Sequence, residues 1–168
     1  MNAKPYHVLF LCTANSARSI LAEAVLNGLG DGRFIAHSAG SMPRGRVHPM
    51  ALTVLAANGY AVAGLRSKSW DEFGGADAPV MMDFVFTVCD NAANELCPIW
   101  PGQPISAHWG MADPAGVGAD EAQCQQAFET ALLQISRRIR LFADLPHTQL
   151  ERTALAAAVR AIAADGAN

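Results

Sequence analysis

Strand-like and helix-like hydrophobic patterns alternate along most of this chain. Apolar runs of strand length, typical of buried parallel strands, occur at 6–11, 33–38, 83–88 and 105–108. Apolar residues three and four positions apart, which form one face of a helix, occur at 19–29, 49–58 and 120–143, and a short helical turn is predicted at 70–73. This alternation predicts an α/β fold: a three-layer, doubly wound, mostly four-stranded parallel sheet with helices on both faces.

A further helix is predicted near the C-terminus. Pro146 ends the long helix, and Thr148 with Glu151 has the spacing of a capping box. Three apolar residues then follow at helical spacing: Leu155, Val159 and Ile162. We therefore divide the chain into an α/β domain, residues 1–145, and a C-terminal helical extension, residues 146–168.

The most informative segment joins the first strand to the first helix. Its sequence is Cys12-Thr13-Ala14-Asn15-Ser16-Ala17-Arg18-Ser19. The residues between the cysteine and the arginine are small or turn-forming, so their N–H groups can curl around an anion. The N-terminus of the helix adds positive charge at the same point. Arg18 offers a planar fork of donors for a tetrahedral oxyanion, and Ser19 can donate a hydrogen bond to the sulfur.

We expect residues 13–18 to bind an oxyanion and Cys12 to act as a nucleophilic thiolate. Oriented N–H groups and a helix N-terminus both favour the charged sulfur, so the pKa of Cys12 is predicted to lie well below that of a free thiol. The alternative is that Cys12 is a buried apolar residue at a strand end, which is common for free cysteine.

Composition narrows the functional classes. The chain has 168 residues, of which 51% are hydrophobic and 16% charged, so it can bury a real core and is not disordered. A formal net charge of −3 indicates no nucleic-acid partner, and no apolar run is long enough to indicate a membrane partner. The N-terminus lacks a secretory pattern, so we expect a cytoplasmic protein. Four cysteines in such a protein favour redox or catalytic use over structural disulfides.

Two of those cysteines, Cys89 and Cys97, follow the third strand at a separation of eight positions. On a continuous helix they would lie roughly 12 Å apart, too far for a disulfide. A bond between them would therefore require the segment to change conformation. The alternative is that Cys89 is a core residue and Cys97 an ordinary loop residue. No metal site is expected, because no Cys-x2-Cys pair is present.

An Asp-Pro pair, Asp113-Pro114, follows the fourth strand. Proline biases the backbone of the preceding residue to extended conformations, which can hold the carboxyl group over a neighbouring site as a general acid. His108 and Trp109 are expected to brace this loop. The alternative is ordinary turn chemistry. Because parallel strands end at one edge of the sheet, Cys12, Cys89 and this loop should meet there.

Three motifs in this order resemble those of arsenate reductases built on the low-molecular-weight tyrosine phosphatase fold. They are the segment 12–19, Cys89…Cys97-Pro98, and His108-Trp109-Gly110…Asp113-Pro114. The resemblance runs from about residue 6 to residue 143 and implies that Cys12 attacks arsenate held by the loop and Arg18, while Asp113 protonates the departing hydroxide. Phosphate and sulfate would compete with arsenate.

The resemblance also implies a disulfide relay. Cys89 would attack the Cys12–arsenic adduct, release arsenite and form a Cys12–Cys89 disulfide. Cys97 would then attack Cys89 and present a Cys89–Cys97 disulfide to an external thiol reductant, with no bound cofactor. The spacing of Cys89 and Cys97 is one residue longer than in thioredoxin-coupled members. The reductant is therefore left open between thioredoxin and glutathione with glutaredoxin.

In some relatives, the positions of Asn15, Glu23 and Ser38 would help to bind a potassium ion. Here Lys68 replaces the acidic residue that completes the site, so we expect its ammonium group to take the place of the cation. The alternative is a solvated surface lysine.

Two other functions compete with arsenate reduction. A small tyrosine phosphatase would use the same thiolate to form a phosphocysteine, but such phosphatases carry an aromatic residue where this chain has Ala115, and they have no need of Cys97. A non-catalytic arsenite- or zinc-binding sensor would use the three thiols but neither Arg18 nor Asp113.

Overall fold

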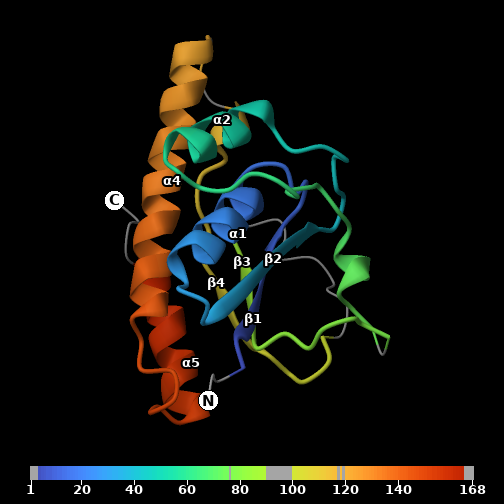
Figure 1. Cartoon of the computed structure of the whole chain (residues 1–168), viewed down its shortest axis with the longest axis vertical. Coiled ribbons are helices and arrows are strands. Elements are labelled where there is room, and N and C mark those ends of the chain that lie inside the picture. The colour runs from blue at the N-terminus through green and yellow to red at the C-terminus, as the bar shows by residue number, and fades with distance from the viewer. Residues whose placement is uncertain (1–3, 76, 90–99, 117, 119, 165–168) are drawn as a thin grey trace.

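The computed structural model of the chain describes residues 4–75, 77–89, 100–116, 118 and 120–164. Cys97 therefore lies outside the described residues. Within them, strands form a parallel sheet in the order β2-β1-β3-β4 (Figure 1): β1 (Tyr6–Cys12), β2 (Phe34–Gly40), β3 (Phe84–Thr87) and β4 (Ile105–His108). The order reverses direction at β1, as in doubly wound sheets. The predicted fold class is confirmed.

Helices connect these strands close to the predicted positions. The described α-helices are α1 (Arg18–Leu29), α2 (Pro49–Ala57), α4 (Glu121–Ala143) and α5 (Arg152–Ala161). The 3-10 turns are η1 (Trp70–Glu72), η2 (Pro114–Gly116) and η3 (Ile162–Ala164). Figure 1 shows α1, α2, α4 and α5 on one side of the sheet and η1 on the other.

Side chains that alternate along β1 build a core on each face of the sheet. Val8 and Phe10 point into the larger cluster, which the α-helices cover. Leu9 and Leu11 point into a smaller cluster, where Phe73 next to η1 also packs. Since β1 is buried on both faces, its sequence is a continuous apolar run.

The C-terminal helix differs from its prediction at its start. Glu151 is itself the N-cap of α5, with no side-chain cap hydrogen bond, so the predicted capping box of Thr148 and Glu151 is wrong. The reason is that residues 147–150 form a separate turn, in which the N–H groups of Gln149 and Leu150 both donate to the carbonyl of Pro146. α5 then packs against β4 and contributes Leu155 and Val159 to the larger core, and Ile162 at the start of η3 joins them, as the spacing predicted.

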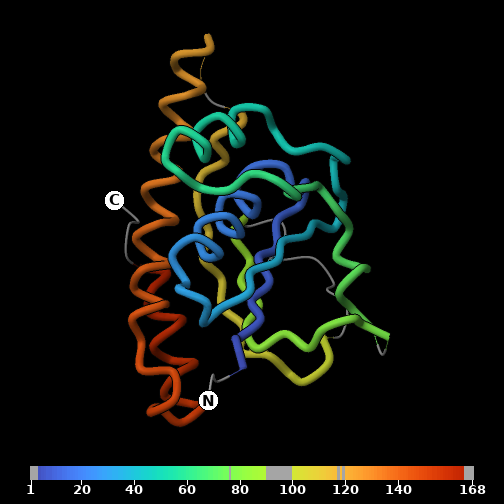
Figure 2. The backbone as a smooth tube through the Cα atoms, viewed as in Figure 1, coloured from blue at the N-terminus to red at the C-terminus, as the bar shows by residue number. Residues whose placement is uncertain are grey.

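The strands end at the edge of the sheet where the predicted site residues lie. β1 ends at Cys12, Cys89 follows β3, and the segment after β4 leads to Asp113. Figure 2 shows these turns together, at the end of the sheet away from α5. Among the described residues, no helix combines the length and hydrophobicity needed to cross a bilayer.

Candidate active site

The loop between β1 and α1, called here the cysteine loop (residues 12–18), has its carbonyl groups turned outward. Backbone N–H groups of the segment 42–48 donate to three of them: Met42 to Thr13 (3.0 Å), Arg44 to Ala14 (2.9 Å) and His48 to Ser16 (2.9 Å). In a trans peptide the N–H points opposite to the C=O, so these peptides direct N–H groups toward the enclosed side of the loop. This is the geometry of an anion-binding nest.

The start of α1 adds to the same anion-binding geometry. Its N-cap residue, Ala17, makes no side-chain cap hydrogen bond, and its first turn contains no acidic residue. N–H groups in the first turn of a helix have no partner within the helix. They carry the positive end of the helix dipole, so α1 supplies donors and partial positive charge to an oxyanion in the loop.

Two residues allow the cysteine loop to turn so tightly. Asn15 has φ of 47°, in the left-handed region that asparagine adopts more readily than most residues. Gly40, which pairs with Cys12 across β1 and β2, passes directly behind the loop. A Cβ atom on Gly40 would lie 2.3 Å from the carbonyl oxygen of Thr13, so only glycine permits this approach.

The side chain of Asn15 connects the loop to a buried polar network. Its Nδ2 donates to the hydroxyl oxygens of Ser19 (2.8 Å) and Ser38 (3.0 Å), and Ser38 donates to Glu23 Oε1 (2.8 Å). Its Oδ1 accepts from the backbone N–H of Lys68 (2.9 Å). Every residue expected at the cation site therefore lies in one network. Donation from Ser19 to the sulfur of Cys12 stays a prediction.

Lys68 supplies the positive charge of this network. Its Nζ donates to the carbonyl of Arg66 (2.9 Å) and lies 3.5 Å from both Ser38 Oγ and Glu23 Oε1. The side chain is only 7% exposed, so the alternative of a solvated surface lysine is wrong. Burial lowers the pKa of Lys68, and the carboxylate of Glu23 acts in the opposite direction.

Cys12 and Cys89 are buried free thiols whose side chains interact with one another. The hydroxyl oxygen of Thr13 also lies 3.6 Å from Cys89 Sγ. The hydrogen bond with Cys89 and burial raise the pKa of Cys12, while the charge of Arg18 and the N–H of Thr13 lower it. The predicted low pKa is therefore wrong for this arrangement. The sequence argument considered the N–H and guanidinium donors around Cys12 but not the second sulfur. The interaction with Cys89 favours the protonated form of Cys12.

Arg18 links the cysteine loop to the segment that carries Asp113. One terminal nitrogen donates to the carbonyl of Met111 (3.0 Å), and the other lies 3.7 Å from Asp113 Oδ2. The Nε atom of Arg18 is buried and has no hydrogen-bond partner within the described residues. A buried donor without a partner is costly, and an oxyanion in the cysteine loop would supply the missing acceptor.

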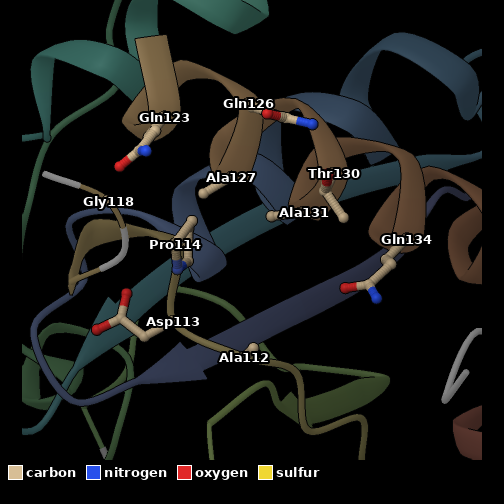
Figure 3. A pocket seen from close by; sticks show the side chains of 10 residues that line it. All are labelled: Ala112, Asp113, Pro114, Gly118, Gln123, Gln126, Ala127, Thr130, Ala131 and Gln134. Atoms are coloured by element: carbon tan, nitrogen blue, oxygen red, sulfur yellow. The ribbon is translucent and has the colours of Figure 1, made fainter. Parts of the chain in front are cut away.

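A pocket of about 560 Å³ lies between α4 and the segment after β4 called here the acid loop (residues 109–116). Asp113 and Pro114 form one wall, and side chains of α4 form the other (Figure 3): Gln123, Gln126, Ala127, Thr130, Ala131 and Gln134. Asp113 Oδ1 accepts from the N–H of Ala115 (3.0 Å), which fixes the turn. The carboxyl group is half exposed, so it is accessible to a reactant at the loop.

Comparison with known proteins identifies the family. The family model for low molecular weight phosphotyrosine protein phosphatase matches residues 7–155. The chain belongs to this phosphatase family. Its curated relatives within the family include a protein from Synechocystis sp. named glutaredoxin arsenate reductase. The two are 32% identical over 132 residues, which cover 79% of this chain and 92% of the relative.

Solved structures of the same fold agree. A structure titled an arsenate reductase in the phosphate binding state has a TM-score of 0.66 and 30% identity, covering 82% of this chain and 96% of that one. A thioredoxin-dependent arsenate reductase of Corynebacterium glutamicum has a TM-score of 0.61 and 26% identity, over 83% of this chain. The match spans 61% of that longer protein.

For this phosphatase-family chain, the structure brings together Cys12, Arg18, Cys89 and Asp113, as predicted, while Cys97 lies outside the described residues. No group of three or more His, Cys, Asp or Glu residues able to hold a metal occurs in the described part of the chain. Sequence reasoning missed the roles of Gly40 and of segment 42–48. The position of Gly40 at the end of the second strand could have indicated its role. The donors in segment 42–48 are backbone N–H groups, so no side-chain pattern identifies them.

Proposed function

We propose that this chain is an arsenate reductase that transfers two electrons from thiols to arsenate. The observation that carries the proposal is a second buried free thiol, Cys89, beside the anion-binding loop that holds Cys12, with its sulfur 3.6 Å from the hydroxyl oxygen of Thr13. A phosphatase needs one sulfur at this place, whereas reduction needs a second thiol able to reach the first. The names of the relatives support the same reaction.

In the first step, the cysteine loop and Arg18 hold arsenate, the thiol of Cys12 gives its proton to an arsenate oxygen, and the sulfur attacks the arsenic(V) atom. Asp113 donates a proton to the departing oxygen, which leaves as water. The position of Asp113 supports this role, because its half-exposed carboxyl group lies 3.7 Å from Arg18, the residue that would hold the anion. The loop N–H groups stabilise the negative charge on the remaining oxygens.

In the second step, the sulfur of Cys89 attacks the sulfur of Cys12. The new S–S bond forms as the S–As bond breaks, and that electron pair stays on arsenic, which leaves as arsenite. Two thiols have then lost two electrons and arsenic(V) has become arsenic(III). The position of Cys89 supports this step, since its sulfur interacts with Cys12 and lies 3.6 Å from the hydroxyl oxygen of Thr13, the residue after Cys12.

The disulfide then has to be reduced. We propose that Cys97 attacks Cys89, freeing Cys12, and that an external dithiol reduces the Cys89–Cys97 bond. The relatives include one named for glutaredoxin and one named for thioredoxin, so both reductants are candidates. A relay of this kind requires a reducing compartment, and we place the protein in the cytoplasm.

Lys68 is proposed to replace an alkali cation in the network behind the loop. Its ammonium group contacts Ser38 and Glu23 and connects through them to Asn15, so a fixed charge is already present where a bound ion would act. We expect arsenate reduction to be insensitive to potassium. Activation by potassium that sodium does not reproduce would contradict this assignment.

The test of the proposed function is a turnover assay with arsenate. We would compare thioredoxin plus its reductase with glutathione plus glutaredoxin, in the original chain and in C12S, C89S and C97S. The proposal expects arsenite production with at least one system. C12S and C89S should abolish it with either system, and C97S should abolish it where an external dithiol reduces the Cys89–Cys97 bond. Absence of arsenite with both systems, in a folded protein that binds phosphate, would overturn it.

A second function shares the same machinery. The family match supports phosphomonoester hydrolysis, in which Cys12 would form a phosphocysteine and Asp113 would protonate the leaving group. Cys89 is not needed for that reaction. We therefore expect weak aryl-phosphate hydrolysis that survives C89S, whereas arsenate reduction does not.

A further inference from the structure

The acid loop begins in a segment that is held on several sides. Trp109 N–H donates to the carbonyl of Thr87 (2.7 Å), and Met111 N–H donates to that of Val88 (3.3 Å). These bonds continue the pairing of β4 with β3 for a few residues. These bonds use the N–H groups of Trp109 and Met111. The carbonyl groups of the same segment remain to be bound by other parts of the chain.

Arg138 binds two of those carbonyl groups. It lies in α4 and is 3% exposed. One terminal nitrogen donates to the carbonyls of Trp109 (2.9 Å) and Gly110 (3.0 Å), and the other donates to the carbonyl of Ala163 in η3 (3.3 Å). A guanidinium group can do this because its donors lie in one rigid plane, whereas an ammonium group has no such fixed spacing. Arg138 therefore joins the acid loop to the C-terminal segment.

Trp109 makes a second connection to the same segment. Its indole ring is fully buried and stacks on Phe86 with ring centroids 4.0 Å apart. Its Nε1 donates to the carbonyl of Val159 in α5 (3.1 Å). Both C-terminal acceptors, Val159 and Ala163, lie beyond residue 155, where the family match ends.

We propose that Arg138 is a positioning residue for Asp113, and that residues 159–163 take part by binding Arg138 and Trp109 through their carbonyl groups. Arg138 holds the carbonyls of residues 109 and 110, Trp109 fixes the same backbone through α5, and Arg18 binds the carbonyl of Met111. The backbone just before Asp113 is thereby held between the catalytic arginine and the C-terminal segment. This inference rests on the proposed function, since it assigns Asp113 the role of proton donor.

A purely structural role would have a different signature. If Arg138 only stabilised the fold, its replacement would affect every activity equally and independently of Asp113. If it acts through Asp113, its replacement should lower kcat and leave arsenate affinity unchanged, because the cysteine loop and Arg18 bind the anion. The effect should also disappear when Asp113 can no longer donate a proton.

The experiment is a double-mutant cycle of R138M and D113N in the full chain, read as kcat and KM for arsenate reduction. A general acid contributes typically 10²–10⁴-fold to a rate, so we expect about a tenfold loss of kcat in R138M from misplacement of Asp113, with KM within about twofold. In the D113N background, R138M should have less than about a twofold effect. R140M, which removes an exposed arginine one turn from the end of α4, is the matched control and should leave kcat unchanged.

Three results would overturn the inference: no loss of kcat in R138M, an equal loss in both backgrounds, or an equal loss in R140M. Near-ultraviolet circular dichroism establishes that each variant is folded. If R138M does not fold, W109F replaces it in the same cycle. That change removes the bond to Val159 and part of the buried ring volume, but it keeps a stacked aromatic ring.

Failure of the proposed function gives a different result. If the original chain releases no arsenite, the same cycle is run on aryl-phosphate hydrolysis. R138M should then slow phenyl phosphate more than 4-nitrophenyl phosphate, because the poorer leaving group depends more on Asp113. Equal slowing of the two substrates would overturn the role of Arg138, whatever the physiological substrate.

Discussion

Two buried cations, Lys68 and Arg138, hold the cysteine loop and the acid loop in different ways. Lys68 lies behind the cysteine loop, where it contacts the carboxylate of Glu23 and one carbonyl. Arg138 lies behind the acid loop and binds three carbonyl groups from two distant parts of the chain. Lys68 supplies charge to a compact polar network, whereas Arg138 supplies directed donors to backbone.

The difference matches the needs of the two loops. The cysteine loop already has its shape from Asn15, Gly40 and the donors of segment 42–48, so it needs a charge more than a further restraint. The acid loop has a short strand before it and carries the half-exposed carboxyl group of Asp113, so it depends on fixed backbone contacts. A point charge suits the first loop and a planar fork suits the second.

The largest effect on stability is expected from K68M. This change leaves the carboxylate of Glu23, which is only 13% exposed, without its cation, and breaking a buried pair typically costs about 3 kcal/mol or more in the free energy of unfolding. Urea denaturation measures the loss. The double variant K68M/E23Q removes both charges and should regain at least half of it. A double variant no more stable than K68M would show that the pairing of charges is not what stabilises this network.

A smaller loss is expected from N15A, which cuts the connection between Lys68 and the cysteine loop. It removes hydrogen bonds to Ser19, Ser38 and the N–H of Lys68 from a fully buried site, at about 2 kcal/mol in the free energy of unfolding. Phosphate affinity should fall as well, because alanine adopts φ of 47° with difficulty. Isothermal titration with phosphate measures this, and an unchanged affinity would mean that the loop keeps its shape without Asn15.

The thiol pair between the two loops makes a prediction about pH. The hydrogen bond with Cys89 is the largest cause that raises the pKa of Cys12, so C89A should lower that pKa and leave Arg18 and the Thr13 N–H to favour the thiolate. The midpoint of Cys12 alkylation by iodoacetamide should move to lower pH than in the original chain, with C124A as the control. A midpoint that stays in place or rises would contradict the role given to Cys89.

The smallest effect is expected far from both cations, at His147. Its ring is buried among Tyr6, Phe34, Phe84 and Phe142, and burial lowers its pKa below the unfolded value of about 6.5. The neutral ring therefore stabilises the fold above that pH, and this contribution is lost as pH falls below it.

In H147F, the drop in Tm between pH 7.5 and pH 5.5 should be smaller than in the original chain. It should not vanish, because burial and His7 also lower the pKa of His37, to about 4. An identical drop in both proteins would show that protonation of His147 does not oppose folding.

Sequence reasoning identified most of the cysteine loop and little of what holds the acid loop. The motif from Cys12 to Ser19 follows a two-face-buried strand and precedes a helix, so local patterns sufficed there. Lys68 could be linked to the network only through a family resemblance, because 30 residues separate it from Ser38.

No sequence pattern indicates the role of Arg138, because an arginine in an amphipathic helix is expected to be solvated. Its partners are backbone carbonyls of segments far along the chain, which no side-chain pattern records. The raised pKa of Cys12 escaped prediction for a similar reason. Two sulfurs that lie far apart in sequence make contact only through the pairing of β1 and β3.

The most direct measurement of the central claim is a single turnover without external reductant. Fully reduced C97S protein would be mixed with arsenate, and arsenite, free thiols and the disulfide-linked peptides would be quantified. We predict one arsenite released per protein, the loss of two thiols and a peptide pair joined through Cys12 and Cys89, with none of these in C12S. Two results would contradict the account: a C97S protein that binds phosphate but releases no arsenite, or equal release of arsenite after C89S is added to it.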